Sequence, residues 1–456
     1  MSQHIASPST ASVRPIPGPK GYPFVGVAPQ FLRDPLAFTV RAMHTYGGIM
    51  RLPIGPRNLV MVVHPDLLRR VLQENVRNYA KNYAVIQELL GNGLATSNGE
   101  IWLRQRRLMQ PAFHHRQITM MVELMAAEIA RLRERWRAVA ASGVTLNLAE
   151  EMLALAQAII MRTMFSAEPS EDSAQIGTAF AVAMRVAERK NYRPSWMPRR
   201  VYAQEDGRYN QAVAFLEQRV FAMIAERRRA GSDRGDLLDM LLTAQDAESG
   251  EYMSDQQIRD EVMTIYFAGH ETTANVLTWT FVLLARHPDV AQRLRAEYAE
   301  KLAGGDPGAA DLGQLTYGRQ VLDEVMRLLP PAWMVTRVAV QDDQLGGYHI
   351  PAGSRIALSP YLTHRMAEFW PDPERFDPNR HSPELAAGRH KFAYVPFILG
   401  PRKCIGDAFA LTEMQLALPM LLQHFILTEA PGEPVQPMPQ GTLRPSGPVM
   451  MEIRQA

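Results

Sequence analysis

Residues 397–406 read FILGPRKCIG, and they contain Cys404, the only cysteine among the 456 residues of the chain. Gly400 and Gly406 bracket this cysteine, and glycine permits the tight turns and close backbone approach that a flat ligand requires. Cys404 also stands just before a predicted helix, whose free N–H groups can point at the sulfur and favour the thiolate. A lone cysteine is more often a small buried hydrophobic residue, so the rest of the chain must decide between the two interpretations.

The composition excludes several classes of protein. A single cysteine rules out a disulfide within the chain and a zinc site built on cysteine pairs, and it favours a reducing, cytoplasmic setting. Lys and Arg (49) nearly balance Asp and Glu (47), which argues against nucleic acid or a membrane surface as a partner. The sequence shows no apolar run long enough to span a bilayer and no signal peptide in its Ser- and Pro-rich N-terminal stretch. These features predict a soluble protein.

Helical periodicity dominates the chain from Pro65 to about Arg286, and short strands with Pro- and Gly-rich loops follow. The segment 254–286 is apolar on several sides, as is typical of a buried helix, and Ser254 with Gln257 predicts a capping box at its start. We therefore predict a mainly α fold: one large helical domain, residues 17–456, with small β-sheets at its margin and a long central helix, after a flexible lead-in, residues 1–16. The other predicted elements are helices 34–46, 117–140, 146–165, 209–229 and about 406–424, and strands 49–54, 59–63, 335–340, 348–350, 355–358, 425–428 and 449–453.

The segment around Cys404 resembles the haem-binding loop of the cytochrome P450 family, Phe-x-x-Gly-x-Arg-x-Cys-x-Gly, and matches each of its fixed positions. Ile398 replaces a glycine that many members have, and the Gly-Pro-Arg form of the loop is closer to the fatty-acid-oxidising and microsomal-like branches. The resemblance implies that Cys404 binds the iron of haem b and that Phe397 and Gly406 contact the cofactor. A cysteinate that donates electron density to haem iron favours cleavage of the O–O bond.

A second motif, WLRQR at residues 102–106, resembles the family's Trp-x-x-x-Arg helix. Positions i and i+4 share one helix face, so the Trp102 indole and the Arg106 guanidinium can bind one carboxylate together. The resemblance identifies this carboxylate as a haem propionate and implies that Arg337 and Arg402 also pair with propionates, since a planar guanidinium binds carboxylates bidentately. Taken alone, each of these residues is better explained as a packed Trp or a surface Arg.

A third motif, AGHETT at residues 268–273, lies in the middle of the predicted central helix. Glycine and threonine are poor choices for a helix interior, and a local rule broken there indicates function. We expect Gly269 to leave space for a small ligand such as dioxygen, and the Thr272 hydroxyl to bond back to the carbonyl of Ala268 and admit water. Glu271 would relay protons from solvent. The resemblance implies these roles in oxygen activation, with Ala268 and Gly269 beside the cofactor.

A fourth motif, Glu324-Val-Met-Arg327, resembles the family's Glu-x-x-Arg pair. By resemblance we expect Arg375, in the stretch Pro373-Glu-Arg-Phe376, to complete a buried triad that supports the Cys404 loop. Residues 270–271 also begin like the zinc motif His-Glu-x-x-His, but Ala274 stands where the second histidine belongs. Four motifs in the family's order are rarely a coincidence.

The resemblance implies a haem-dependent monooxygenase that inserts one atom of O2 into a lipophilic substrate, by hydroxylation or epoxidation of a fatty acid, a terpenoid or a polyketide. No Gly-rich nucleotide-binding loop stands out, so we expect a separate electron donor, a ferredoxin or flavodoxin with its reductase. Its predicted docking site is a basic patch of Arg104, Arg107, Lys391 and Lys403. The alternatives are a haem-thiolate peroxygenase or isomerase, or a non-catalytic haem sensor, none of which needs an acid–threonine pair.

Overall fold

The computed structural model describes residues 14–54, 57–167, 171–190, 193, 197–231 and 234–456. The helices are α1 (Ala28–Arg33), α2 (Pro35–Tyr46), α3 (Pro65–Arg69), α4 (Ala84–Leu90), α5 (Gly99–Met109), α6 (His115–Ser142), α7 (Leu148–Phe165), α8 (Glu171–Lys190), α9 (Ala203–Ala230), α10 (Leu237–Thr243), α11 (Asp255–Arg286), α12 (Pro288–Leu302), α13 (Thr316–Leu328), α14 (Pro360–Thr363), α15 (Pro383–Ala386) and α16 (Asp407–Leu422). The strands are β1 (Ile49–Ile54), β2 (Arg57–Val62), β3 (Tyr79–Lys81), β4 (Leu146–Asn147), β5 (Val335–Ala339), β6 (Asp343–Leu345), β7 (Tyr348–Ile350), β8 (Arg355–Leu358), β9 (Phe425–Glu429), β10 (Pro437–Pro439), β11 (Leu443–Pro445) and β12 (Met450–Gln455).

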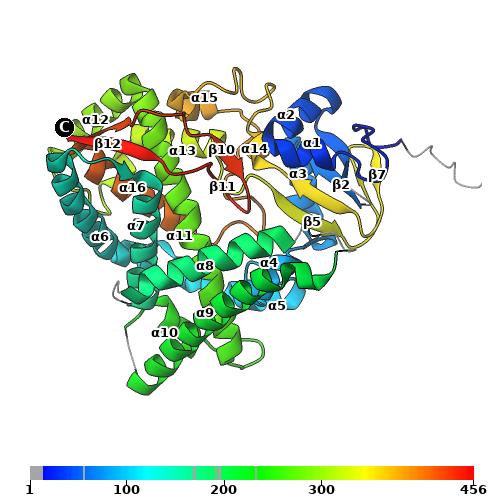
Figure 1. Ribbon diagram of the computed structural model, residues 1–456, viewed down its shortest axis with the longest axis horizontal. Coiled ribbons are helices and arrows are strands. Elements are labelled where there is room, and N and C mark those ends of the chain that lie inside the picture. The colour runs from blue at the N-terminus through cyan, green and yellow to red at the C-terminus, as the bar shows by residue number, and fades with distance from the viewer. Residues whose placement is uncertain (1–13, 55–56, 168–170, 191–192, 194–196, 232–233) are drawn as a thin grey trace, which may run out of the picture.

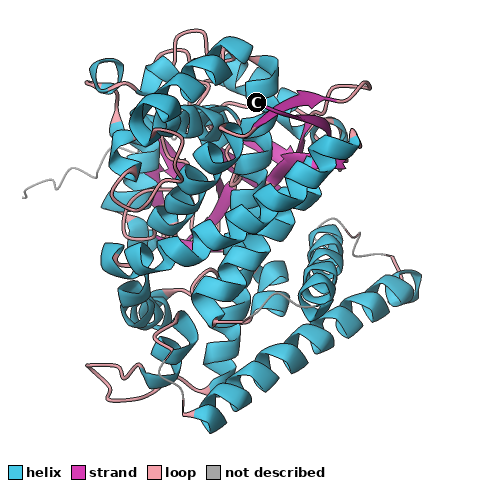
Figure 2. Ribbon diagram, turned by 90° about the vertical axis from the view of Figure 1, so that its left-hand side faces the viewer, coloured by secondary structure: helices cyan, strands magenta, loops and turns pink. Residues whose placement is uncertain are grey.

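Helices form the bulk of the molecule, and the strands lie in small sheets at its margin, as the sequence predicts (Figure 2). In Figure 1 the long helices α6, α7, α12 and α16 gather on the left, while α1, α2 and the strands of the largest sheet lie on the right. The predicted lead-in, residues 1–16, lies mostly outside the described residues. Among the described helices, none is both long enough and apolar enough to cross a lipid bilayer.

The central helix α11 confirms the predicted helix 254–286. Ser254 is its N-cap, because its Oγ accepts a hydrogen bond from the backbone N–H of Gln257 at 3.2 Å. The capping box is only half formed, since the side chain of Gln257 turns away and accepts a bond from Arg104 at 3.2 Å. Buried residues surround α11 along most of its length, and α7 is the helix that packs most extensively against it. Most of the buried residues of α11 are apolar, as is typical of a helix enclosed by the rest of the protein.

The largest sheet has the strand order β1-β2-β8-β5-β3. Its first two strands form the predicted hairpin, in which Ile49 pairs with Val62; the predicted turn at residues 55–56 lies outside the described residues. At the other edge β3 pairs antiparallel with β5, so that Lys81 lies opposite Arg337 although 256 positions separate them in the numbering. This register brings together two cations that no local pattern in the sequence connects.

Most predicted elements are found within one to three residues of their predicted ends, and β7 and β8 match their predicted ranges. The predicted helix 146–165 begins two residues late, because Leu146 and Asn147 pair with β12 as strand β4. The helix predicted at 209–229 is longer, since α9 starts at Ala203. Helices α8 and α12 have no counterpart among the predicted elements.

Arg327 is the centre of the buried network that carries the Cys404 loop. Its guanidinium donates to both oxygens of Glu324, at 2.7 and 2.9 Å, and neither side chain is accessible to solvent. It also donates to the backbone carbonyls of Pro373 and Arg375. On the same helix, directly before Glu324, Arg319 and Asp323 form an ion pair whose arginine is 41% exposed. The complete burial of the Glu324–Arg327 pair is therefore distinctive.

The expected place of Arg375 in this network is wrong. Its side chain is 67% exposed, and only its carbonyl oxygen reaches Arg327, because residues 372–375 form a turn that directs the backbone inward. His381 and Arg380 take its place: His381 Nε2 lies 3.0 Å and Arg380 Nε 3.6 Å from the Glu324 carboxylate. The network therefore uses the second arginine of the stretch 373–381.

His364 connects this network to the segment that leads into the Cys404 loop. One ring nitrogen lies 3.1 Å from the carbonyl of Arg327, and the other accepts the N–H of Val395 at 2.8 Å. This histidine is fully buried. The position of the loop thus depends on helix α13 through a chain of hydrogen bonds.

Candidate functional site

The Cys404 loop is a tight turn that ends at the start of α16. The N–H of Cys404 donates to the carbonyl of Phe397 at 3.0 Å. Gly400 has φ +80°, and a Cβ there would lie 2.0 Å from the carbonyl oxygen of Leu72, so no other residue fits. Ile398 also has a positive φ, +57°, which explains why glycine is frequent at this position. The isoleucine costs about 1–2 kcal/mol of backbone strain, which its packing against the neighbouring apolar cluster partly offsets.

The thiol of Cys404 faces the interior of the protein. Its residue retains accessible surface, yet burial raises the pKa of the thiol, against the opposing effects of the Gly406 N–H, Arg106 and Lys403. Both observations fit a sulfur that borders a hollow inside the molecule. The predicted N–H group at the helix start is present and opposes this rise in pKa, and a bound metal cation would favour the thiolate further.

The middle of α11 borders a hollow in the same way. Ala268 is exposed although nearly all residues of the helix on both sides are buried. The Thr272 hydroxyl donates to the carbonyl of Ala268 at 2.6 Å, as predicted. Since α11 also packs against α16 and α13, the accessible surface of Ala268 lies within the body of the protein and not on its exterior.

Gly269 lies where α11 packs against α7. A Cβ at Gly269 would lie 2.1 Å from Cδ1 of Ile160, a residue of α7. A larger residue would therefore require the end of the Ile160 side chain to move, so the small size of glycine also serves the close approach of the two helices. The predicted role of Gly269 beside a small ligand stays a prediction.

Glu271 has its carboxylate held by a distant segment. Its Oε1 accepts the Thr442 hydroxyl at 2.6 Å, a contact that the sequence does not indicate. The neighbouring His270 is buried and stacks on Tyr266, with 4.6 Å between the ring centroids. Its surroundings are those of a packed aromatic residue.

Four cations lie close together near Cys404: Lys81 of β3, Arg337 of β5, Arg106 of α5 and Arg402 of the Cys404 loop. Lys81 lies opposite Arg337 in the sheet, and Arg402 donates to the carbonyl of Tyr79 at 3.0 Å. Arg106 donates to the carbonyl of Lys403 at 2.9 Å. The Trp102 ring lies between two of the cations, 5.8 Å from Lys81 Nζ and 5.5 Å from Arg402 Cζ.

Within the described residues no carboxylate forms an ion pair with any of these four cations. Burial, reinforced by the charges of Arg337, Arg402 and Arg106, lowers the pKa of Lys81 to about 7. Burial also lowers the pKa of the Arg106 and Arg402 guanidinium groups. Arg337 is buried and the other three cations are partly buried, and cations withdrawn from water together without an anion are costly, so this cluster favours an anionic ligand.

Haem b fits this arrangement. Its two propionates would supply the missing negative charges, and the sulfur of Cys404 would be the protein ligand of its iron. Within the described residues there is no cluster of three or more His, Cys, Asp or Glu side chains that could hold a metal, so a metal at Cys404 needs further ligands from outside the protein, as a porphyrin provides. Lys81 was missed by the sequence analysis, because only the register of β3 against β5 places it in the cluster.

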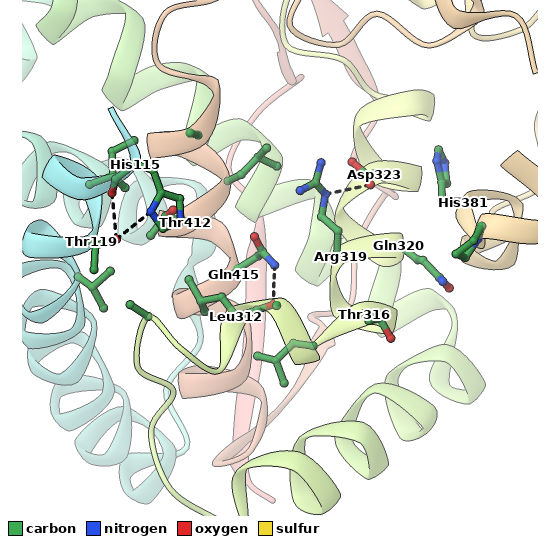
Figure 3. Close-up of a pocket in the computed structure, with 18 residues that line it drawn as sticks. His115, Thr119, Leu312, Thr316, Arg319, Gln320, Asp323, His381, Thr412 and Gln415 are labelled. Atoms are coloured by element: carbon green, nitrogen blue, oxygen red, sulfur yellow. Dashed lines mark hydrogen bonds and ion pairs between the residues drawn. The ribbon is translucent and has the colours of Figure 1, made fainter. Parts of the chain in front are cut away.

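A separate cavity of about 520 Å³ lies on the other side of α16 (Figure 3). Residues of α6, α13 and α16 line it, among them His115, Arg319 and Gln415, and the Arg319–Asp323 ion pair of 2.9 Å crosses one wall. None of the predicted site residues lines this cavity. Its wall includes Ala408, in the first turn of the helix that follows Cys404.

Most of the cations in the predicted basic docking patch are already paired with carboxylates of this chain. Asp246 accepts from Arg107 at 2.8 Å and lies 3.6 Å from Arg104, because the acidic segment 246–251 folds onto α5. The pair with Arg107, together with the N–H groups of Ser249 and Glu248, lowers the pKa of Asp246 well below its usual range. Lys403 forms an ion pair with Asp407 while remaining 45% exposed, and Lys391 is exposed. Three of the four predicted cations therefore have a carboxylate partner, and of the three Lys403 is the one that is more than 40% exposed.

Comparison with known proteins supports the resemblance over nearly the whole chain. A family model described as Cytochrome P450 matches residues 16–453. Cyclooctatin synthase of Streptomyces melanosporofaciens is 37% identical, with 97% of this chain and 96% of that protein covered. Pentalenene oxygenase of Streptomyces avermitilis is 36% identical, with the same coverage. The crystal structure of the cytochrome P450DA heme domain superposes with a TM-score of 0.89 at 30% identity, covering 97% of this chain and 98% of that one.

Proposed function

Because the chain belongs to the cytochrome P450 family, we propose that it oxygenates a cyclic terpenoid, with Cys404 as the protein ligand of its iron. It is a monooxygenase with haem b as cofactor, and it uses O2, a lipophilic substrate and a redox partner. Bound haem supplies the redox chemistry by which one atom of O2 is transferred to the substrate. The single observation that carries the assignment of the site is the cluster of four buried or partly buried cations without an anion beside Cys404.

We assign the binding residues as follows. Lys81, Arg106, Arg337 and Arg402 bind the propionates, since each presents N–H donors and none has a carboxylate partner among the described residues. Trp102 packs beside them. Phe397 and Gly406, on either side of the thiol, and Ala268 of α11 contact the flat faces of the cofactor. Gly269 serves the packing of α7 on α11.

Glu271 and Thr272 are the residues to which we assign proton delivery. The Thr272 hydroxyl donates its one proton to the carbonyl of Ala268, so its lone pairs are left to accept a hydrogen bond from a water molecule. Glu271 relays protons from solvent towards this position. A peroxygenase, an isomerase or a haem sensor has no use for this pair, so its presence favours the monooxygenase.

The proposal of a cyclic terpenoid rests on the relatives and on the apolar residues near the site. One further relative, 37% identical over 91% of this chain, is named cyclooctat-9-en-7-ol 5-monooxygenase. Phe267, Trp333 and Met334, which the family resemblance places around the substrate, are all partly or fully buried apolar residues. They offer area for a lipophilic ring system but little for a charged head group.

Difference spectra test this proposal. We expect the purified protein, reduced under carbon monoxide, to show the strongly red-shifted Soret band of a haem–thiolate complex. We further expect pentalenene to shift the ferric spectrum with an affinity about tenfold or more above that of a linear fatty acid of equal carbon number, which corresponds to roughly 1.4 kcal/mol. Equal or tighter binding of the fatty acid would contradict the terpenoid assignment, and the absence of the Soret shift would contradict the role of Cys404.

We also propose that the redox partner is a ferredoxin or flavodoxin whose acidic surface docks around Lys403 and Lys391. Reversing both charges, Lys403→Glu with Lys391→Glu, is expected to slow reduction of the enzyme by about tenfold at low ionic strength, and less at high salt, because the attraction is screened. Stopped-flow reduction with a ferredoxin measures this rate. Lys301→Glu on α12, which makes an equal change of charge per site, is the control; equal rates in all three proteins would contradict this docking site.

A further inference from the structure

The turn between β10 and β11 reaches the middle of the central helix and meets Glu271 there (Figure 1). Thr442, in this turn, donates from its hydroxyl to Oε1 of Glu271 at 2.6 Å, across 171 positions of the chain. The same hydroxyl oxygen accepts a hydrogen bond from Nδ2 of Asn275 at 3.1 Å. Thr442 and Asn275 are both buried, so water competes little with either bond.

The chemistry of Asn275, Thr442 and Glu271 fixes which group donates in each of the two hydrogen bonds. The amide nitrogen of Asn275 can only donate, and a hydroxyl has a single proton. Because the Thr442 oxygen already accepts from Asn275, its proton is directed to Glu271. Glu271 and Asn275 stand four residues apart and therefore on one face of α11, which lets a single hydroxyl bridge them.

The turn itself is held firmly in place. The Trp333 indole N–H donates to the carbonyl of Gln440 at 2.8 Å, and the N–H of Leu443 donates to the carbonyl of Pro331 at 2.9 Å. The N–H of Gln440 closes the turn onto the carbonyl of Thr442 at 3.0 Å. Thr442 is thus anchored on both sides to the segment 331–333, and it can impose its position on the carboxylate.

The hydrogen bonds of Thr442 differ from those that the threonines of α11 make. Thr278 and Thr280 of α11 are buried and donate to the carbonyls four residues earlier, at 2.7 Å each, as Thr272 also does. Such bonds satisfy a hydroxyl within its own helix. Thr442 comes from another part of the chain and bonds to the side chains of two residues of α11.

We propose that Thr442, oriented by Asn275, is a positioning residue that holds the Glu271 carboxylate in the orientation from which it delivers protons. One carboxylate oxygen is fixed by Thr442, and within the described residues the other, Oε2, has no protein hydrogen-bond partner and is left for proton transfer. This inference rests on the role of Glu271 given above. A loose carboxylate would deliver protons in fewer turnovers, so that electrons would be lost to peroxide.

The test compares Thr442→Val, which keeps the shape but removes the donor, with Thr442→Ser, which keeps the donor. With pentalenene as probe substrate and a ferredoxin with its reductase as donor, we expect Thr442→Val to lower the product formed per NADH by about tenfold, the loss of one hydrogen bond to a charged group. Peroxide should rise in proportion. The serine variant should recover most of the coupling, whereas a residue needed only for packing would not be rescued by the smaller side chain.

Further measurements separate this role from damage to the fold. Thermal unfolding and the pentalenene-induced spectral shift of Thr442→Val should stay close to wild type, and the matched buried variant Thr280→Val should couple normally. If Thr442→Val couples as wild type while Glu271→Gln does not, the inference about Thr442 is overturned and the role of Glu271 stands. If Glu271→Gln and Thr272→Ala both couple as wild type, the assigned proton delivery fails, and the inference fails with it.

Discussion

Replacing Cys404 by serine is expected to abolish the red-shifted Soret band of the reduced carbon monoxide complex and to lower product formation by about 100-fold or more, equivalent to roughly 3 kcal/mol of activation free energy. Serine keeps the size of the side chain and the N–H bond from Cys404 to Phe397, so the loop should retain its shape. The hydroxyl is a much weaker electron donor to iron than a thiolate. The carbon monoxide spectrum and single-turnover product analysis measure the two effects.

Ile405→Val is the matched control for Cys404→Ser, because it shortens the adjacent side chain by one methylene and leaves the sulfur in place. It should cost at most about 1.5 kcal/mol of stability and leave the spectrum unchanged. A Cys404→Ser protein that kept both the red-shifted band and its activity would exclude Cys404 as the iron ligand. Since the chain has no other cysteine, such a result would remove the thiolate from the mechanism altogether.

Removing the Glu324 side chain is expected to have the largest effect on stability. Glu324→Ala leaves the fully buried guanidinium of Arg327 without its bidentate partner, and an uncompensated buried charge costs about 3–5 kcal/mol. Because Arg327 also binds the carbonyl of His364, and His364 holds Val395, we expect the variant to lose haem as well. Chemical unfolding and the haem-to-protein absorbance ratio measure the two effects.

Arg319→Ala, on the same helix, is the control for Glu324→Ala. It removes a pair of the same type whose arginine is 41% exposed, and such surface pairs contribute about 0–1 kcal/mol. Similar losses of stability in the two variants would contradict the special role assigned to the buried pair. The comparison isolates burial, because both pairs lie on α13.

The Glu324–Arg327 pair makes the stability of the protein depend on pH. Burial would raise the pKa of Glu324, but hydrogen bonds from Arg327 and His381 outweigh it and lower the pKa from its ordinary value of 4.5. A carboxyl with a lowered pKa in the folded state contributes stability above its unfolded value, and this contribution is lost as the pH falls below it. The difference in unfolding free energy between wild type and Glu324→Ala should therefore shrink below about pH 4.5.

Local sequence patterns were sufficient for the architecture and for the centre of the site. The helical period of 254–286 predicted α11, and alternation in short apolar runs predicted β7 and β8. The motif around Cys404 predicted the iron ligand that we propose, and the AGHETT motif predicted the Thr272 bond to Ala268, which the structure shows. Each of these features depends on residues within a few positions of one another, where helical and strand geometry fix which side chains meet.

Other roles were decided by tertiary structure alone. Lys81 joins the cation cluster only through the pairing of β3 with β5, and Thr442 meets Glu271 only because the β10–β11 turn is anchored to residues 331–333. Packing also places Ile160 against Gly269, and it overruled one expectation, because Arg380 with His381 replaces Arg375 beside Glu324. Asp246 neutralises part of the predicted docking patch.

The sequence by itself thus determined which residues can carry the chemistry: a single thiol, an acid next to a threonine, and arginines at helical spacing. The tertiary structure decided which charges are left unpaired, which glycine faces a neighbouring helix, and which side chain holds the acid. The physical reason is the separation along the chain of the residues that each feature depends on. Backbone periodicity is encoded over a few residues, whereas the partner of a buried charge or hydroxyl is set by strand register and helix packing between segments that lie more than 100 residues apart in the chain, as in the Thr442–Glu271 bond.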